Sequence, residues 1–94
     1  MADAISELLA TDAARVKLGA RGIATAEAEQ LPRNRYAMVR NPHSGGQEGE
    51  RLLLIGHTDG GRALTLVIER TVDPTSWLIV TGWIATERER RILG

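Results

Sequence analysis

Arginine side chains stand where two apolar runs begin, and arginine is suited to binding phosphate. Arg51 begins one run and Arg62 begins the next. The planar guanidinium group binds phosphate or carboxylate through two parallel hydrogen bonds. Because a turn connects the runs, we expect the two arginines at opposite ends of a strand pair. Each of them either binds a phosphate or forms a salt bridge with Glu48, Glu50 or Glu69.

Proton transfer needs a different side chain, and His57 is the candidate for it. His57 ends the run that Arg51 begins, and histidine gains and loses a proton near neutral pH. The alternative is a turn residue that faces solvent. The two histidines have no carboxylate motif beside them and the chain has no cysteine, so we expect no metal site. We also expect no cofactor, because the chain has no phosphate-binding loop motif.

A second group of cations lies in the N-terminal half. Residues 15–40 carry six cations and two carboxylates, although the net charge of the chain is zero. Lys17 and Arg21 lie four residues apart on a predicted helix, where like charges repel unless an anion lies between them. Arg33 and Arg35 extend this basic segment. The segment either binds phosphate or acidic groups, or it is a solvated surface.

Three apolar runs predict consecutive antiparallel strands. They are residues 52–55, 64–68 and 77–83, which are rich in branched side chains. The first connection contains Asp59-Gly60, a pair that tolerates positive φ in a tight hairpin. The second contains Pro74, which cannot donate to a sheet and is expected outside it. Residues 36–40 predict a fourth strand, and residues 41–46 predict a loop.

Helices are predicted at both ends of the chain. Apolar residues recur at the helical period over residues 4–20, which predicts one or two helices there, with Asp12 as the N-cap between them and Gly22 as the left-handed end. Thr25 is expected to start a second helix over residues 26–31, which Pro32 ends.

The C-terminal helix is predicted by its cap. Thr86 and Glu89 have the spacing of a capping box, so we expect a helix from about Thr86 to the C-terminus. Glu87 and Arg91 lie four residues apart on this helix and can form a surface ion pair.

The two tryptophans lie in the third apolar run. Trp77 and Trp83 are six residues apart, which places them on the same face of a strand if no bulge intervenes. The pair either packs in the core or, if its face is exposed, forms an interaction patch.

These elements predict an α+β fold in a single domain of residues 1–94. It has N-terminal helices, an antiparallel sheet of about four strands and a short C-terminal helix. An apolar content of 43% is that of a folded protein. No apolar run approaches the roughly 20 residues that span a bilayer, and the N-terminus does not resemble a signal peptide. We therefore expect a cytoplasmic protein without membrane contact.

Five segments carry a resemblance to a known family. They are residues 18–23 (Leu-Gly-Ala-Arg-Gly-Ile), 25–29 (Thr-Ala-Glu-Ala-Glu), 51–56 (Arg-Leu-Leu-Leu-Ile-Gly), 61–65 (Gly-Arg-Ala-Leu-Thr) and 80–90 (Val-Thr-Gly-Trp-Ile-Ala-Thr-Glu-Arg-Glu-Arg). In order and spacing they resemble the BrnT-like branch of the RelE/ParE-type bacterial toxins, and the resemblance covers residues 12–93.

The resemblance implies the toxin component of a type II toxin-antitoxin system. Such a protein is a metal-independent endoribonuclease that a cognate antitoxin neutralises, and its fold is a compact RelE/BrnT-like sheet with helices on one side and a concave basic face. Cleavage of RNA by its own 2′-hydroxyl needs a base, an acid and cations that stabilise the phosphate. The catalytic candidates are Arg51, His57, Arg62, Glu87 and Arg90. The candidates for binding RNA or a partner are Lys17, Arg21, Arg33, Arg35 and Trp83.

The N-terminus and two further positions leave alternatives open. The family's usual N-terminus implies a short strand over residues 2–10, where the apolar pattern favours a helix. Arg21 stands where the family has a histidine, and Trp83 stands where it has an arginine. Loss of one stabilising donor costs about 10²–10³ in rate, whereas an exposed tryptophan stacks on a base. The second hypothesis is therefore a non-catalytic member of the same fold that binds protein or nucleic acid.

Overall fold

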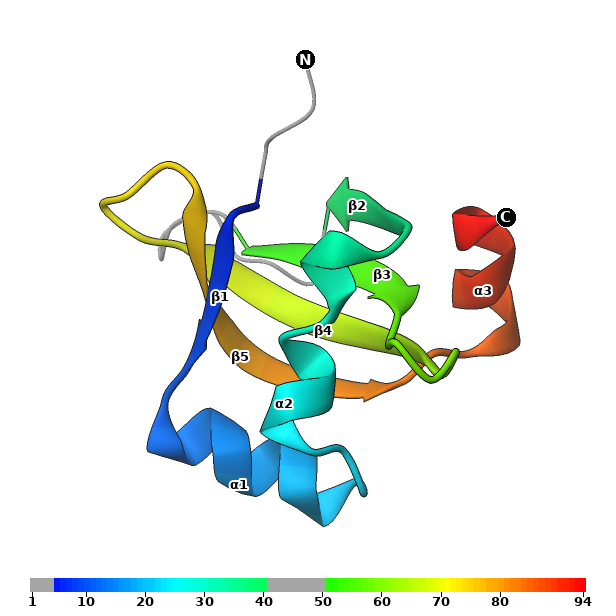
Figure 1. Ribbon diagram of the computed structural model, residues 1–94, viewed down its shortest axis with the longest axis horizontal. Coiled ribbons are helices and arrows are strands. Elements are labelled where there is room, and N and C mark those ends of the chain that lie inside the picture. The colour runs from blue at the N-terminus through cyan, green and yellow to red at the C-terminus, as the bar shows by residue number, and fades with distance from the viewer. Residues whose placement is uncertain (1–4, 41–50) are drawn as a thin grey trace.

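The structure is a computed structural model that describes residues 5–40 and 51–94. It has an α+β fold built on one five-stranded sheet with the strand order β1-β5-β4-β3-β2 (Figure 1). The elements in chain order are β1 (Glu7–Ala10), α1 (Asp12–Ala20), α2 (Thr25–Ala28), the 3-10 helix η1 (Leu31–Arg33), β2 (Tyr36–Arg40), β3 (Arg51–His57), β4 (Ala63–Arg70), β5 (Ser76–Ile84) and α3 (Glu87–Leu93). No helix in the two described ranges is long and apolar enough to cross a lipid bilayer.

The first strand takes the place of the N-terminal part of the helix expected over residues 4–20. β1 pairs in parallel with β5, whereas every other pair of neighbouring strands is antiparallel. Leu8 is buried and Leu9 is exposed, which is the alternation of a strand with one covered face. The helical expectation is therefore wrong for residues 7–10, and the sheet has five strands instead of about four.

The expected end of the first helix is confirmed, and its expected start is corrected. Gly22 has a φ of 74°, and the amide of Ile23 bonds to the carbonyl of Leu18 at 3.0 Å. This is a Schellman motif, in which the buried side chains of Leu18 and Ile23 lie on either side of the left-handed glycine in the chain. The N-cap is Thr11 rather than Asp12, because the Thr11 hydroxyl accepts an amide of the first turn at 3.1 Å.

The second helix is shorter than expected. α2 occupies Thr25–Ala28 instead of residues 26–31, and its N-cap position is Ala24 rather than Thr25. Pro32 does not end this helix but lies inside η1. Its missing amide hydrogen costs little there, because the first amides of a helix have no internal partner.

The three strands expected from the apolar runs and the fourth expected at residues 36–40 are all present. β2 has the expected bounds, and β3, β4 and β5 extend beyond the apolar runs at their ends. In the β3–β4 hairpin the positive φ falls at Gly61, at 89°, rather than in the Asp59-Gly60 pair. The Gly61 amide bonds to the Thr58 carbonyl at 2.9 Å, so a tight turn precedes a left-handed glycine. Pro74 lies outside the sheet as expected.

The predicted C-terminal helix and its capping box are confirmed. The Thr86 hydroxyl accepts the Glu89 amide at 3.2 Å, and the Glu89 carboxylate accepts the Thr86 amide at 2.8 Å. The loop expected at residues 41–46 lies outside the described residues.

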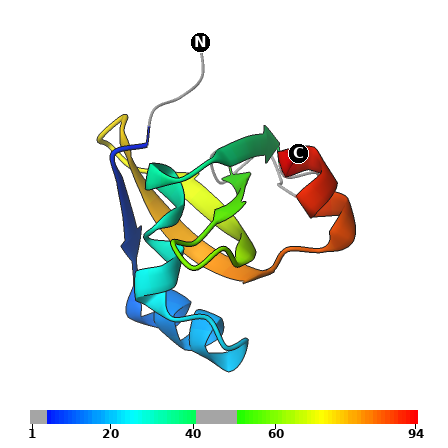
Figure 2. The same ribbon diagram turned by 45° about the vertical axis from the view of Figure 1, so that its right-hand side comes forward.

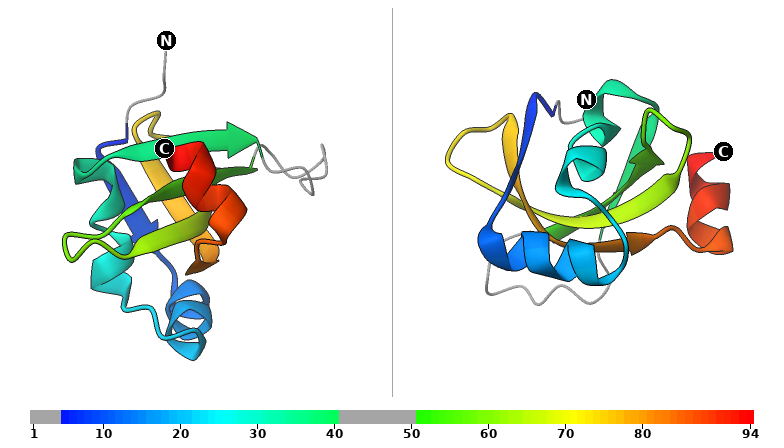
Figure 3. Two further views of the ribbon diagram at one scale, coloured as in Figure 1. Left: turned by 90° about the vertical axis from the view of Figure 1, so that its right-hand side faces the viewer. Right: turned by 60° about the horizontal axis from the view of Figure 1, so that its bottom comes forward.

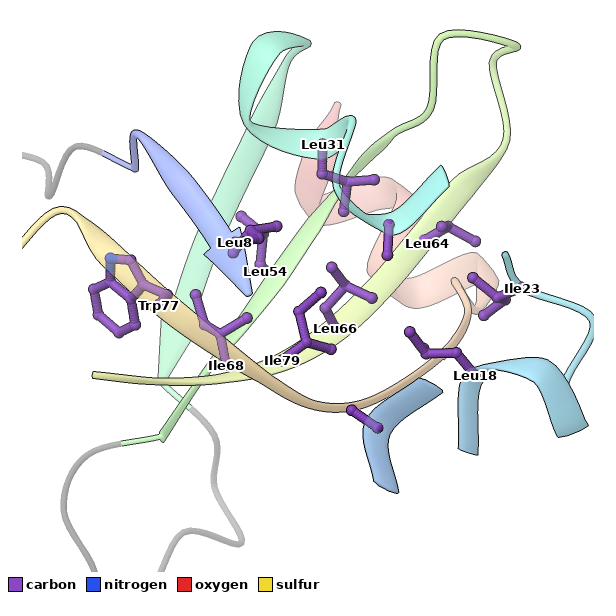
Figure 4. Close-up of a cluster of buried hydrophobic side chains, with 12 residues drawn as sticks. Leu8, Leu18, Ile23, Leu31, Leu54, Leu64, Leu66, Ile68, Trp77 and Ile79 are labelled. Atoms are coloured by element: carbon purple, nitrogen blue, oxygen red, sulfur yellow. The ribbon is translucent and has the colours of Figure 1, made fainter. Parts of the chain in front are cut away.

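Both faces of the sheet carry apolar cores. The larger core lies where α1, α2 and η1 cover one face (Figure 4). Its buried residues are Leu8, Ala14, Leu18, Ile23, Ala28, Leu31, Leu54, Leu64, Leu66, Ile68, Trp77 and Ile79. A smaller core of Ile55, Ala85 and Leu93 lies beneath α3. Figure 2 shows α3 on the other side of the sheet from α1 and α2.

A β-bulge places the two tryptophans on opposite faces. Consecutive residues of β4 pair with Ile79 and Thr81 of β5, which leaves Val80 as the extra residue. Trp77 is fully buried in the larger core, whereas Trp83 faces the side of the sheet that α3 covers. A shared face was expected only if no bulge intervenes; the bulge is present, and its one extra residue reverses the alternation of side chains.

Gly82 lies where α1 packs against β5. A Cβ atom at Gly82 would lie 2.6 Å from Leu66 Cδ2 and 3.0 Å from Leu18 Cδ2. Such distances are shorter than a van der Waals contact between carbon atoms. The absence of a side chain at Gly82 therefore lets Leu18 of α1 seat on the strand.

We predict that Gly82→Ala lowers the free energy of unfolding by about 1–3 kcal/mol, because the added methyl group overpacks the core. The matched control is Gly19→Ala, where a Cβ meets no atom within 4 Å. That change raises the free energy of unfolding by about 0.5–1 kcal/mol, because alanine is the better helix former. Urea denaturation measures both. A Gly82→Ala variant as stable as the wild type contradicts the close packing.

Candidate nucleic-acid interface

An open groove of about 410 Å³ lies between α1 and β5, lined by Lys17, Ala20, Arg21 and Thr81. Lys17 and Ala20 share one face of α1, because residues three apart on a helix are neighbours, and Arg21 is the C-cap residue that follows Ala20. β1 covers the edge of β5 only as far as Ile79. Beyond that point no strand of the described chain pairs with this edge, and α1 runs beside it (Figure 3). The structure thus brings together Lys17 and Arg21, two of the predicted binding residues.

Arg21 is fixed in this groove by two hydrogen bonds. Its Nη1 donates to the carbonyl oxygen of Gly82 at 2.8 Å and to the hydroxyl of Thr81 at 3.0 Å. The first of these bonds satisfies the main-chain carbonyl of Gly82 at the edge of the sheet. Sequence reasoning did not identify Thr81, because its role depends on a contact between residues 60 apart in the chain.

Trp83 belongs to a polar network beside α3. Its indole Nε1 donates to Glu89 Oε1 at 3.0 Å, and the Thr65 hydroxyl donates to the same oxygen at 2.8 Å. The Thr86 amide is the third donor. Partial burial alone would raise the pKa of Glu89, but these hydrogen bonds outweigh it and hold the pKa below its ordinary value. Trp83 is therefore partly exposed but held in one orientation.

Glu89 is a functional candidate that sequence reasoning recognised only as a helix cap. The capping box signals its bond to the Thr86 amide, but no local spacing signals the bonds to Thr65 and Trp83. Those depend on the pairing of Thr65 with Trp83 across β4 and β5.

Ion pairs engage two of the predicted arginines at the hairpin. Arg33 pairs with Asp59 at the hairpin tip, and its guanidinium, with the Asn34 amide, holds the pKa of Asp59 below its ordinary value. Arg62 pairs with Glu27 of α2 at 2.8 Å. The Ala24 amide and then Arg62 lower the pKa of Glu27. These pairs tie the β3–β4 hairpin to α2 and η1.

Two further predicted residues form the salt bridges weighed as alternatives. Arg51 pairs with Glu69, its neighbour across the β3–β4 ladder, at 3.3 Å. Glu87 pairs with Arg91 on the exposed surface of α3 at 2.8 Å.

The remaining predicted residues lie around the end of the sheet near α3. His57 ends β3, opposite Ala63. Arg90 is exposed on α3. Arg35 places its guanidinium against Gly94, where a Cβ would lie 2.8 Å from Arg35 Nη2.

The predicted catalytic residues do not form one cluster. Arg51 and His57 begin and end the same strand, so about 20 Å of extended chain separates them. Among the described residues no group of three or more metal-ligating side chains converges. The described residues that line the groove supply cationic donors and no carboxylate, so the chemistry that the groove supports best is the binding of an anion.

We predict that Glu89→Gln lowers the free energy of unfolding at pH 7 by about 1–3 kcal/mol, because the amide cannot replace a carboxylate that accepts three donors. The matched control is Glu87→Gln, which removes only an exposed pair and changes stability by about 0.5 kcal/mol or less.

The effect of Glu89→Gln depends on pH. The folded-state pKa of Glu89 lies below the ordinary value of 4.5 expected for the unfolded chain. The contribution of the carboxylate is therefore complete above pH 4.5 and is lost as pH falls through the lower folded-state pKa. Denaturation curves from pH 7 to pH 3 test this. A stability gap between wild type and Glu89→Gln that stays constant with pH contradicts the network.

Comparison of the chain with protein-family models, with curated proteins and with solved structures finds no match. The groove, the ion pairs and the network of Trp83 are therefore the observations from which a function for this chain is inferred.

Proposed function

We propose that this chain is the toxin component of a type II toxin-antitoxin system. It acts in the bacterial cytoplasm as a metal-independent endoribonuclease and is neutralised by a cognate antitoxin that covers its basic groove. The proposal extends the resemblance of residues 12–93 to the BrnT-like toxins, and the short N-terminal strand β1 agrees with that resemblance.

One observation carries the proposal. Two of the segments with the family resemblance, residues 18–23 and 80–90, contact each other although they are distant in sequence. Their contact is the bond between Arg21 and the Gly82 carbonyl at 2.8 Å. Three of the residues that line the groove, Ala20, Arg21 and Thr81, therefore lie in segments that carry the resemblance.

The same contact bears on the two positions that differ from the family. Trp83 removes an arginine from β5, but Arg21 brings a guanidinium to the neighbouring carbonyl of that strand. A cation at this place can stabilise the negative charge that develops on phosphate during cleavage. Arg62 contacts the end of the same segment, because its Nη1 is 3.4 Å from the carbonyl of Gly22, the residue that follows Arg21.

A second candidate function is a binding module of the same fold without catalysis. It is favoured by the ion pairs of Arg51 and Arg62, which give both cations a structural role. It is also favoured by the separation of Arg51 from His57 at the two ends of β3.

We predict that inducible expression of the wild type in a bacterium stops growth and degrades RNA. If Arg62 stabilises the phosphate, Arg62→Ala relieves both effects. The expected loss in cleavage rate is about 10²–10³-fold. The control is Glu27→Ala, which breaks the same ion pair but keeps the cation. Because a surface pair contributes at most about 1 kcal/mol, both variants should fold, which circular dichroism checks.

The two variants distinguish the functions. If the enzyme proposal holds, Glu27→Ala remains toxic while Arg62→Ala is harmless. Arg51→Ala and Glu69→Ala, which break the other ion pair, are compared for toxicity in the same way. Abundant, folded wild-type protein that leaves growth and RNA intact contradicts the ribonuclease and leaves the binding module.

A further inference from the structure

We propose that the groove between α1 and β5 binds single-stranded RNA, with a backbone phosphate held by Lys17, Arg21 and Thr81 and the adjacent base stacked on Trp83. The inference rests on the proposed function, since it names the form of RNA that the toxin recognises and the residues that hold it. Of the four residues, only Arg21 also has a part in the cleavage proposed above, so the test uses variants of Lys17 and Trp83.

Arg21 is preorganised to hold a phosphate. A guanidinium group has five N–H donors, and the bonds to Gly82 and Thr81 use only Nη1. The donors on Nε and Nη2 form an edge that can meet two phosphate oxygens together. Because Nη1 is already bound to the strand, little rotational freedom of the side chain is lost on binding.

Lys17 and Thr81 complete the phosphate site. Within the described residues the Lys17 ammonium has no ion-pair partner. The Thr81 hydroxyl accepts from Arg21, and its own hydrogen remains able to donate. An anion between Lys17 of α1 and Arg21, the C-cap residue of the same helix, would relieve the repulsion of two like charges four residues apart.

Trp83 lies beside this site on the same face of β5. Thr81 and Trp83 pair with alternate residues of β4, so their side chains share a face and lie about 7 Å apart. The indole Nε1 of Trp83 donates to Glu89 Oε1 at 3.0 Å, and this hydrogen bond fixes the orientation of the ring. A basic groove beside an aromatic ring is the arrangement that binds single strands, because a base of a single strand is free to stack on the ring. In a duplex the bases are stacked on one another and paired. An acidic peptide would use the cations but not the ring.

The test is the affinity for a short, fluorescently labelled single-stranded RNA, measured by anisotropy. The RNA carries 2′-O-methyl groups, so it cannot be cleaved and binding is separated from chemistry. Lys17→Ala weakens binding about tenfold and reduces the slope of log K against log salt by about 0.7. The matched control is Arg15→Ala, which removes the same charge from α1 at a position about 160° around the helix, and it changes affinity less than twofold.

Two variants of Trp83 test the stacking. Both Trp83→Phe and Trp83→Leu lose the bond to Glu89, but only phenylalanine keeps a ring. We expect Trp83→Leu to weaken binding roughly tenfold relative to Trp83→Phe. We also expect a duplex of the same sequence to bind more weakly than the single strand.

Several results would overturn the inference. They are equal losses for Lys17→Ala and Arg15→Ala, equal affinities of the two Trp83 variants, duplex binding as tight as single-strand binding, or a groove that binds an acidic protein partner and no RNA. If binding follows the prediction but unmodified RNA stays intact, the ribonuclease fails and the binding site stands. If the wild type cleaves RNA and Lys17→Ala binds and cleaves equally well, the binding site fails and the ribonuclease stands.

Discussion

The contact between the end of α1 and the outer edge of β5 determines how the candidate site is built. Leu18 packs over Gly82, where a side chain would not fit, and Arg21 bonds to the carbonyl of the same glycine. The first interaction sets the distance between helix and strand, and the second satisfies the edge of the sheet. Together they hold Lys17 and Arg21 at the edge that β1 leaves uncovered. The Schellman motif at Gly22 ends the helix directly after Arg21.

The bulge at Val80 gives the strand two different faces. Before the bulge, β5 places Trp77 in the larger core. After it, β5 places Thr81 and Trp83 on the other face, where Trp83 meets Glu89 of α3. One extra residue thus converts a continuous apolar strand into a core segment followed by a polar, aromatic segment. Without it, Trp83 would point to the face that holds Leu18, and the groove would have no ring beside it.

Local sequence signals predicted local structure well. The capping box of α3, the end of α1 at Gly22 and the bounds of β2 were all predictable, because each depends on neighbouring residues. The strand at residues 7–10 was ambiguous, since its stability comes from pairing with β5, some 70 residues away. The ion pairs of Arg33 and Arg62 and the role of Thr81 depend on tertiary contacts. The sequence therefore did not distinguish the cations that form ion pairs from those that line the groove.

We propose that the groove between α1 and β5 binds RNA, and an NMR titration with an uncleavable single-stranded RNA tests this most directly. The resonances of Lys17, Arg21 and Thr81, with the indole Nε1 of Trp83, should shift together and saturate at one RNA concentration. The hairpin tip at Asp59 and the outer surface of α3 at Arg91 should stay unchanged. Shifts confined to those other surfaces, or no shifts at RNA concentrations well above micromolar, would contradict the claim.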